Sequence, residues 1–254
     1  MATQTLIPQT TITFPEITLH TRDAHKLRGY FGELFRNYSP LLHNHLQADN
    51  ESATEAIRFR YAYPLVQYKV LRHMPTLVGF GEGAELLTQL FLQVSTLSID
   101  GKHIPVHTKH IRCEQVPIGM ADELVDYQFV TLWMALNQAN YSDYRRYSEA
   151  DRTAQLKRVF TSQILATFRT FGLWLTHHDR LMVHLSLDER ATQFKNQRMI
   201  AFSGRFLANV VLPNGLGLGK GVSRGFGSVE RCVHSDQPNQ LVTRMHDTSW
   251  QPFS

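Results

Sequence analysis

Two histidines separated by a single residue, His43 and His45, are the best candidates for chemistry in this 254-residue chain. They follow the turn-like segment 37–40, so we expect them in a loop or an extended stretch. Cleavage of RNA without a metal requires a base that takes the 2′-OH proton and an acid that protonates the leaving 5′-oxygen. Histidine can serve in both roles because the ordinary pKa of an imidazole is about 6.5. The spacing leaves open which of the two is the acid.

The same pair has other interpretations. A His-x-His pattern is a zinc half-site in some hydrolases, and His103, His107 and His110 could be nominated to complete it. No His-Glu-x-x-His or Cys-x-x-Cys pattern accompanies them, so we predict no metal site. A structural role for the pair also stays open, in which case His20 and His25 are the next candidates for catalysis.

A dense glycine run near the C-terminus is the second candidate feature. Six of the thirteen residues from 215 to 227 are glycine, and Lys220 and Arg224 lie among them. Glycine marks a left-handed backbone or a close approach, and exposed N–H groups in such loops bind anions. The spacing fits neither a nucleoside-triphosphate loop nor a dinucleotide fingerprint. We therefore predict contact with a polyanion, with a flexible hairpin as the alternative.

Two stretches of the chain carry a family resemblance. Gly217-Leu218-Gly219, five further residues and then the run 225–229 (Gly-Phe-Gly-Ser-Val) resemble the C-terminal glycine-rich signature of the CRISPR repeat-processing endoribonucleases, the Cas-six family of the RAMP superfamily. The run 63–70 (Tyr-Pro-Leu-Val-Gln-Tyr-Lys-Val), followed by 77–83, is similar to the N-terminal domain of the I-B-like branch of that family. Because the two matches lie near opposite ends, the resemblance covers most of the chain.

The resemblance implies an α+β fold of two tandem ferredoxin-like (RRM-like) domains, which we place at residues 1–118 and 119–254. It implies metal-independent cleavage of precursor CRISPR RNA within the repeat, without a cofactor, leaving a 2′,3′-cyclic phosphate and a 5′-hydroxyl. His43 and His45 match the location of the catalytic histidines of the branch. The residues that we expect to contact RNA are the glycine run and the cations that precede the histidine pair: Gly217, Gly219, Lys220, Arg224, Gly225 and Gly227, with Lys26, Arg28 and Arg36.

Other function classes stay open beside this one. A non-catalytic RNA-binding subunit of a CRISPR ribonucleoprotein would keep the fold and the glycine run, and a metal-dependent hydrolase would use the His-x-His pair differently. An assembly subunit would bind RNA mainly to recruit protein partners. The expected partner is CRISPR repeat RNA, while other CRISPR-associated proteins and a homodimer remain open.

Composition agrees with an anionic partner. Lys and Arg number 26 against 22 Asp and Glu, which gives a formal charge of +4, and 13 histidines can add to it. Two cysteines are too few for a disulfide framework. The chain contains no apolar run near the roughly 20 residues that span a bilayer and no signal-like start, which predicts a cytoplasmic protein without a membrane partner.

Periodicity outlines the elements that must position these residues. It predicts helices over 23–35, 84–97 and 148–174 and a half-buried strand over 65–71, in which Val66, Tyr68 and Val70 alternate with Gln67 and Lys69. It also predicts strands over 11–19, 104–111, 127–134, 181–187 and 198–212 and after the glycine run. Two helix-on-sheet units in tandem result, with a boundary near 117–122.

Overall fold

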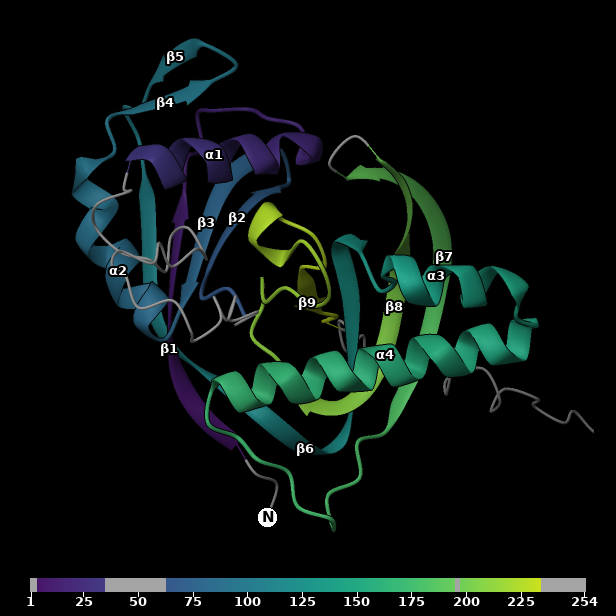
Figure 1. The fold of residues 1–254 in the computed structure, drawn as a ribbon. Helices are drawn as coiled ribbons and strands as arrows, with labels where there is room; N and C mark the ends of the chain where they lie inside the picture. Colours follow the sequence, from purple (N-terminus) through teal and green to yellow (C-terminus); the bar gives the residue numbers. More distant parts are fainter. Residues whose placement is uncertain (1–3, 35–62, 195–196, 234–254) are drawn as a thin grey trace, which may run out of the picture.

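The computed structural model describes residues 4–34, 63–194 and 197–233. A seven-stranded antiparallel sheet curves through the molecule, with its long helices on one face (Figure 1). The first half contains β1 (Gln4–Thr13), η1 (Thr21–Asp23), α1 (Ala24–Leu34), β2 (Val66–Leu71), β3 (Met74–Phe80), α2 (Glu82–Leu90), η3 (Phe91–Gln93), β4 (Thr96–Ile99) and β5 (Lys102–Pro105). The second contains α3 (Gln138–Arg146), α4 (Glu149–Thr170), β7 (Val183–Phe194), β8 (Gln197–Val211), η4 (Val222–Arg224) and β9 (Val229–Arg231), and the long strand β6 (His110–Trp133) belongs to both.

The strand order repeats from one half to the other. The first half pairs its strands in the order β6-β1-β3-β2, and the second in the order β9-β6-β8-β7. Each is the order of a ferredoxin-like unit, in which the first and third strands along the chain lie in the middle and the fourth and second lie at the edges. The predicted fold class is confirmed. In the second half, the stretch between β8 and β9 carries the glycine run where the first half has α2.

One strand serves both units. β6 pairs with β1 through residues 110–119 and with β8 from Gly119 onward, so it continues through the expected boundary at 117–122. The prediction of separate strands over 104–111 and 127–134 is therefore wrong. The N-terminal strand also begins earlier than predicted and ends at Thr13, before Pro15, which has no N–H for a sheet ladder.

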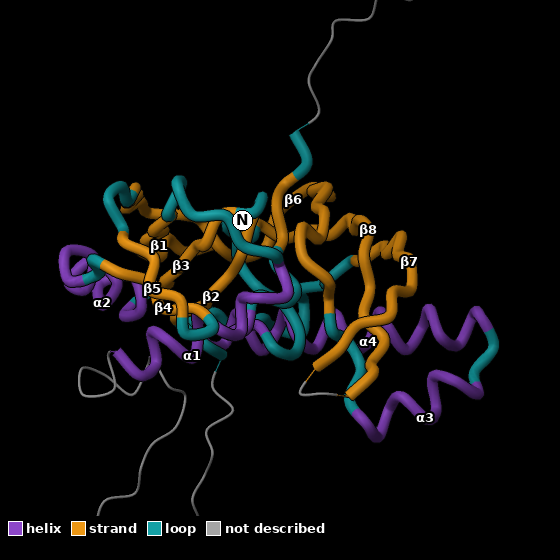
Figure 2. The backbone as a smooth tube through the Cα atoms, turned by 90° about the horizontal axis from the view of Figure 1, so that it is seen from above, coloured by secondary structure: helices purple, strands orange, loops and turns teal. Residues whose placement is uncertain are grey.

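Helix α4 covers the second half of the sheet, close to where the sequence predicts it (Figure 2). Its apolar face, Leu156, Phe160, Ile164 and Phe168, is buried at helical spacing. The rings of Phe160 and Phe206 on β8 lie 4.6 Å apart. No helix in the described ranges is both long enough and apolar enough to cross a bilayer.

Strand β2 departs from the predicted pattern. Periodicity predicts a half-buried strand with Gln67 and Lys69 on its outer face, yet both side chains are fully buried, as is Tyr68 between them. Helix α1 packs against this edge strand, and the η4 turn of the glycine run does so as well. The prediction is wrong because a segment about 150 residues further along the chain covers the face that would otherwise meet solvent.

Candidate nucleic-acid interface

Residues 215–228, which we call the glycine segment, are fastened to β2 by side chains. The Gly217 N–H donates to Gln67 Oε1 over 3.1 Å, and the Gly217 carbonyl accepts from the Tyr63 hydroxyl over 2.8 Å. Gln67 Nε2 in turn donates to the Tyr63 oxygen over 2.9 Å. Both backbone groups of Gly217 are therefore satisfied by the first half of the molecule, which fixes where the segment runs.

A buried lysine makes the second fastening. Lys69 is fully buried, and its Nζ donates to Ser228 Oγ over 2.6 Å. The Ser228 N–H donates to Thr131 Oγ1 on β6 over 2.9 Å. Burial lowers the pKa of Lys69 to about 7, because a desolvated ammonium is less stable than a neutral amine.

The glycines of the segment leave room for the protein's own backbone. Gly225 has φ +88°, and a Cβ added there would lie 2.8 Å from Ala24 Cβ and 3.0 Å from the Tyr68 carbonyl oxygen. At Gly227, φ is +68° and an added Cβ would lie 1.8 Å from the Leu218 carbonyl oxygen. At these positions the close approach that the glycine density predicts is intramolecular. A flexible hairpin does not describe the segment, because Leu216, Leu218 and Val222 are buried in it.

The packing gathers cations from distant parts of the sequence. Arg28 of α1 and Arg224 of η4 are both half-buried. The pKa of Arg28 is lowered, first by burial and next by the positive charge of Arg224, while Tyr68 acts in the opposite direction. Lys220 lies four residues before Arg224 in the sequence and is exposed, and desolvation of its amine by the neighbouring protein lowers its pKa. The arrangement is suited to an anion, since like charges held together are stabilised by an opposite charge between them.

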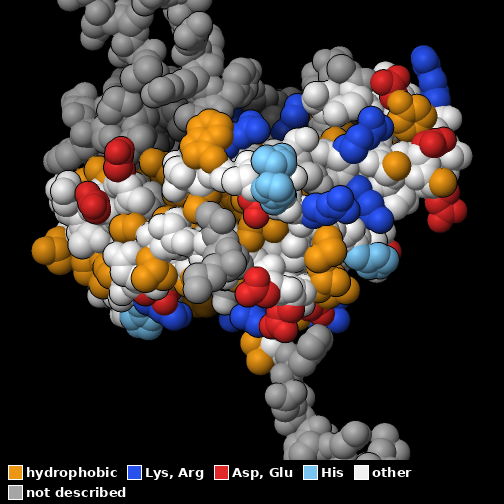
Figure 3. Space-filling model, turned by 90° about the horizontal axis from the view of Figure 1, so that it is seen from below, with side chains coloured by type: hydrophobic (Ala, Val, Ile, Leu, Met, Phe, Trp, Pro, Cys, Tyr) orange, Lys and Arg blue, Asp and Glu red, His pale blue; other side chains and the backbone are white. Residues whose placement is uncertain are grey.

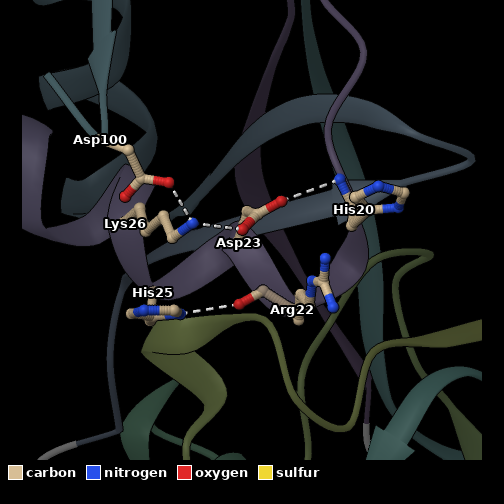
Figure 4. Close-up of polar contacts among 6 residues, drawn as sticks. All are labelled: His20, Arg22, Asp23, His25, Lys26 and Asp100. Atoms are coloured by element: carbon tan, nitrogen blue, oxygen red, sulfur yellow. Dashed lines mark hydrogen bonds and ion pairs between the residues drawn. The ribbon is translucent and has the colours of Figure 1, made fainter. Parts of the chain in front are cut away.

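Lys26 forms ion pairs with two carboxylates. Its Nζ lies 2.7 Å from Asp23 and 2.5 Å from Asp100, between the two carboxylates (Figure 4). The Asp23 carboxylate also accepts the His20 N–H. The hydrogen bond to Asp100, followed by that to Asp23, raises the pKa of Lys26. This ion-pair arrangement ties α1 to the β4–β5 hairpin, so the charge of Lys26 is already balanced.

The histidine pair cannot be placed. His43, His45 and Arg36 lie outside the described residues. His25 lies within them, exposed on α1, with Nδ1 2.7 Å from the Arg22 carbonyl oxygen (Figure 4). A carbonyl only accepts, so Nδ1 carries the hydrogen. Among the described residues, no three His, Cys, Asp or Glu side chains lie where they could hold a metal ion.

A cavity of about 450 Å³ lies apart from these cations, on the face of the first-half sheet away from α1. Threonines of β1 and β3 line it, together with two exposed ion pairs, Arg72–Glu230 at 2.9 Å and Arg112–Glu114 at 2.7 Å. Of its three lining arginines, Arg72 and Arg112 are paired with carboxylates and Arg231 follows Glu230 on β9.

Sequence reasoning missed the residues that fasten the segment. The sequence predicts Gln67 and Lys69 on the outer face of a half-buried strand and assigns Tyr63 no contact. The one signal was their place inside the run 63–70 that carries the family resemblance. Their partners Gly217 and Ser228 belong to the other run, so the two matching stretches are the two sides of one contact.

Comparison with known proteins assigns the family. The Cas6b N-terminal domain model matches residues 5–116, and the Cas6b C-terminal domain model matches residues 119–232. The chain therefore belongs to the Cas6b family. An uncharacterized protein of Methanocaldococcus jannaschii is 30% identical over 144 residues, which are 56% of this chain and 97% of the relative.

Solved structures agree with this assignment. A crystal structure of Cas6b is similar with TM-score 0.81 and 33% identity, covering 90% of this chain and 100% of the other. A second, described as a CRISPR RNA processing endoribonuclease Cas6b, has TM-score 0.71, 30% identity and the same coverage. The type IV protein Csf5 shares the fold, with TM-score 0.57 and 12% identity.

The packing at Gly225 predicts a large effect of one added methyl group. Gly225→Ala should lower the free energy of unfolding by about 1–3 kcal/mol, because the new Cβ overpacks against Ala24 and Tyr68 at a left-handed φ. Gly29→Ala is the matched control, since nothing lies within 4 Å of an added Cβ there. Because Gly29 lies within α1, Gly29→Ala should raise the free energy of unfolding by up to about 1 kcal/mol. Urea unfolding of both variants tests this, and equal effects would contradict the packing.

Burial of Lys69 predicts a pH dependence. Its pKa is about 7 when folded and higher in the unfolded chain, so above pH 7 the unfolded state binds more protons and stability rises with pH. Relative to Lys69→Met, the wild type should gain about 1.4 kcal/mol per pH unit between pH 7.5 and 9. Denaturant unfolding of both proteins across this range measures the difference. A constant difference would mean that Lys69 keeps its charge when folded.

Proposed function

We propose that this chain is a metal-independent endoribonuclease that cleaves precursor CRISPR RNA within the repeat, leaving a 2′,3′-cyclic phosphate and a 5′-hydroxyl. Membership of the Cas6b family and the Cas6b relative described as an RNA processing endoribonuclease support the reaction class. The observation that carries the proposal is the juxtaposition of Arg28 and Arg224. Helix α1, which carries Arg28, packs against the η4 turn, which carries Arg224, and the two half-buried positive charges act on each other, an arrangement that suits a phosphate.

The scissile phosphate lies between these two arginines. Partial burial strengthens their interaction with the charge that develops on the phosphate, because fewer water dipoles oppose it. The fastening of Gly217 and Ser228 to β2 holds Arg224 in place before RNA arrives. Little reorganisation is then needed during the reaction, which is the condition under which charged groups lower a barrier most.

His43 and His45 move the protons. One removes the proton of the 2′-OH, and the O2′ attacks phosphorus as the bond from phosphorus to O5′ breaks. The other donates its proton to O5′, so the products are a cyclic phosphate and a 5′-hydroxyl. The chain enters the segment that carries the pair from the end of α1, on which Arg28 lies. It leaves that segment at Tyr63, whose hydroxyl holds Gly217.

The mechanism predicts activity without metal and loss of activity without either histidine. Cleavage of cognate repeat RNA should persist in EDTA and should stop when the scissile nucleotide lacks its 2′-OH. His43→Ala and His45→Ala should each slow single-turnover cleavage by about 10² to 10⁴ while leaving RNA affinity nearly intact. His110→Ala, at an exposed histidine, is the control. Activity that EDTA abolishes and zinc or magnesium restores would overturn the mechanism, and wild-type rates in both variants would move the site to His20 or His25.

The arginine pair predicts a change in salt dependence. Removing one phosphate contact lowers the slope of log affinity against log salt by roughly 0.7–0.9. Arg28→Ala and Arg224→Ala should each show such a loss, and Lys220→Ala a loss of the same size or smaller. Arg190→Ala removes an exposed charge that is paired with Asp188 on β7 and should leave the slope unchanged. Equal slopes in all four variants would show that the arginine pair does not meet the RNA.

A further inference from the structure

The loop between α4 and β7 lies at the end of the molecule opposite α1 (Figure 1). It carries exposed aromatic and basic side chains. Helix α4 ends where Gly172 takes φ +75°, and the Leu173 N–H bonds back to the Phe168 carbonyl. Leu173 is buried, whereas Trp174 next to it is 69% exposed. The helix ending therefore places a large indole ring at the surface.

Cations and further rings surround this tryptophan. The Arg169 guanidinium lies over the Trp174 ring, 5.6 Å from its centroid. The rings of His177 and His178, both exposed, lie 3.7 Å apart, and exposed Arg180 follows two residues later. On the face that carries this loop, histidine side chains lie between an exposed apolar group and a cluster of Lys and Arg side chains (Figure 3).

The loop is held in shape by its own polar contacts. The Asp179 carboxylate accepts from the Thr176 N–H over 2.7 Å and from the Thr176 hydroxyl over 2.9 Å. Asn209 of β8 anchors the far end, because its side chain donates to the Arg180 carbonyl and accepts from the Met182 N–H. The one acidic group of the loop is thus used internally, and the rings and arginines are preorganised.

We propose that this surface, formed by Arg169, Trp174, His177, His178 and Arg180, binds single-stranded RNA that flanks the repeat. Exposed aromatic rings with interleaved cations provide stacking on bases together with attraction to phosphates. A lipid surface or an apolar protein partner fits less well, because the exposed apolar area is small and cations surround it. The proposal rests on the proposed function, since it assumes that a repeat is held at Arg28 and Arg224.

Binding assays with two RNAs test the proposal. Both contain the repeat with a 2′-deoxy scissile nucleotide, and one adds an unstructured uridine flank on each side. The wild type should bind the flanked RNA more tightly. In Trp174→Ala and in the His177→Ala/His178→Ala double variant, affinity for the flanked RNA should fall at least about fivefold, while affinity for the repeat alone stays at the wild-type value. Trp174→Phe should keep most of the gain, and Leu92→Ala, at a residue that is 82% exposed in the first half, should change neither affinity.

The two proposals fail in different ways. Failure of the wild type to bind the repeat alone would count against the proposed function. Wild-type binding of the repeat without any gain from the flank, or a full gain in Trp174→Ala, would overturn this inference. Crosslinking of a 4-thiouridine oligo-uridine RNA to the whole chain tests the surface without any repeat. A crosslink within residues 169–180 supports the proposal, and crosslinks confined to other regions contradict it.

Discussion

The hydrogen bond between Lys69 and Ser228 joins residues 159 positions apart, and the rest of the interface depends on the contact that it stabilises. With Gln67 and Tyr63, it holds the glycine segment across the edge strand of the first-half sheet. That contact covers Gln67 and Lys69 of β2, two polar side chains that would otherwise meet water. It also brings Arg224 from the second half next to Arg28 of the first.

The glycine content of the segment follows from this constraint. In the first half, the corresponding connection holds α2, a helix about 10 Å wide that only lies over a sheet. The second-half connection must instead fit against α1 and β2, which leaves no room for a Cβ at Gly225, and it folds back on its own Leu218 carbonyl, which leaves none at Gly227. Glycines with positive φ allow the segment to fit there, at a cost in backbone entropy. Burial of Leu216, Leu218 and Val222 offsets that cost. The only cations that the segment carries, Lys220 and Arg224, lie between its buried positions.

The sequence predicts the architecture well because the helices carry strong periodicity. The apolar spacing along α4 locates it within a few residues, and the glycine run and the run 63–70 identify the family. What the sequence could not supply is the contact between those two runs. Alternation makes Lys69 a solvent-facing residue, and no local pattern reveals that a segment 150 residues away will cover it. Similarly, β6 continues through the expected boundary within one sheet. One edge pairs with β1 up to Gly119 and the other with β8 from Gly119 onward, and the boundary is marked only by a register shift between Met120 and Val125. The catalytic assignment of His43 and His45 is a prediction from their position in the chain, and these residues lie outside the described part.

The central claim is that the glycine segment is ordered by the protein itself and presents Arg224 to the RNA in advance. Native-state hydrogen exchange of the RNA-free protein tests it most directly, through the amides of Gly217, Gly225, Gly227 and Val229, all of which donate hydrogen bonds within the protein. The account predicts that they are protected to nearly the same degree as the neighbouring strands β2 and β6, and that repeat RNA changes this protection little. Rapid exchange of these amides in the free protein, with protection appearing only when repeat RNA is added, would contradict it.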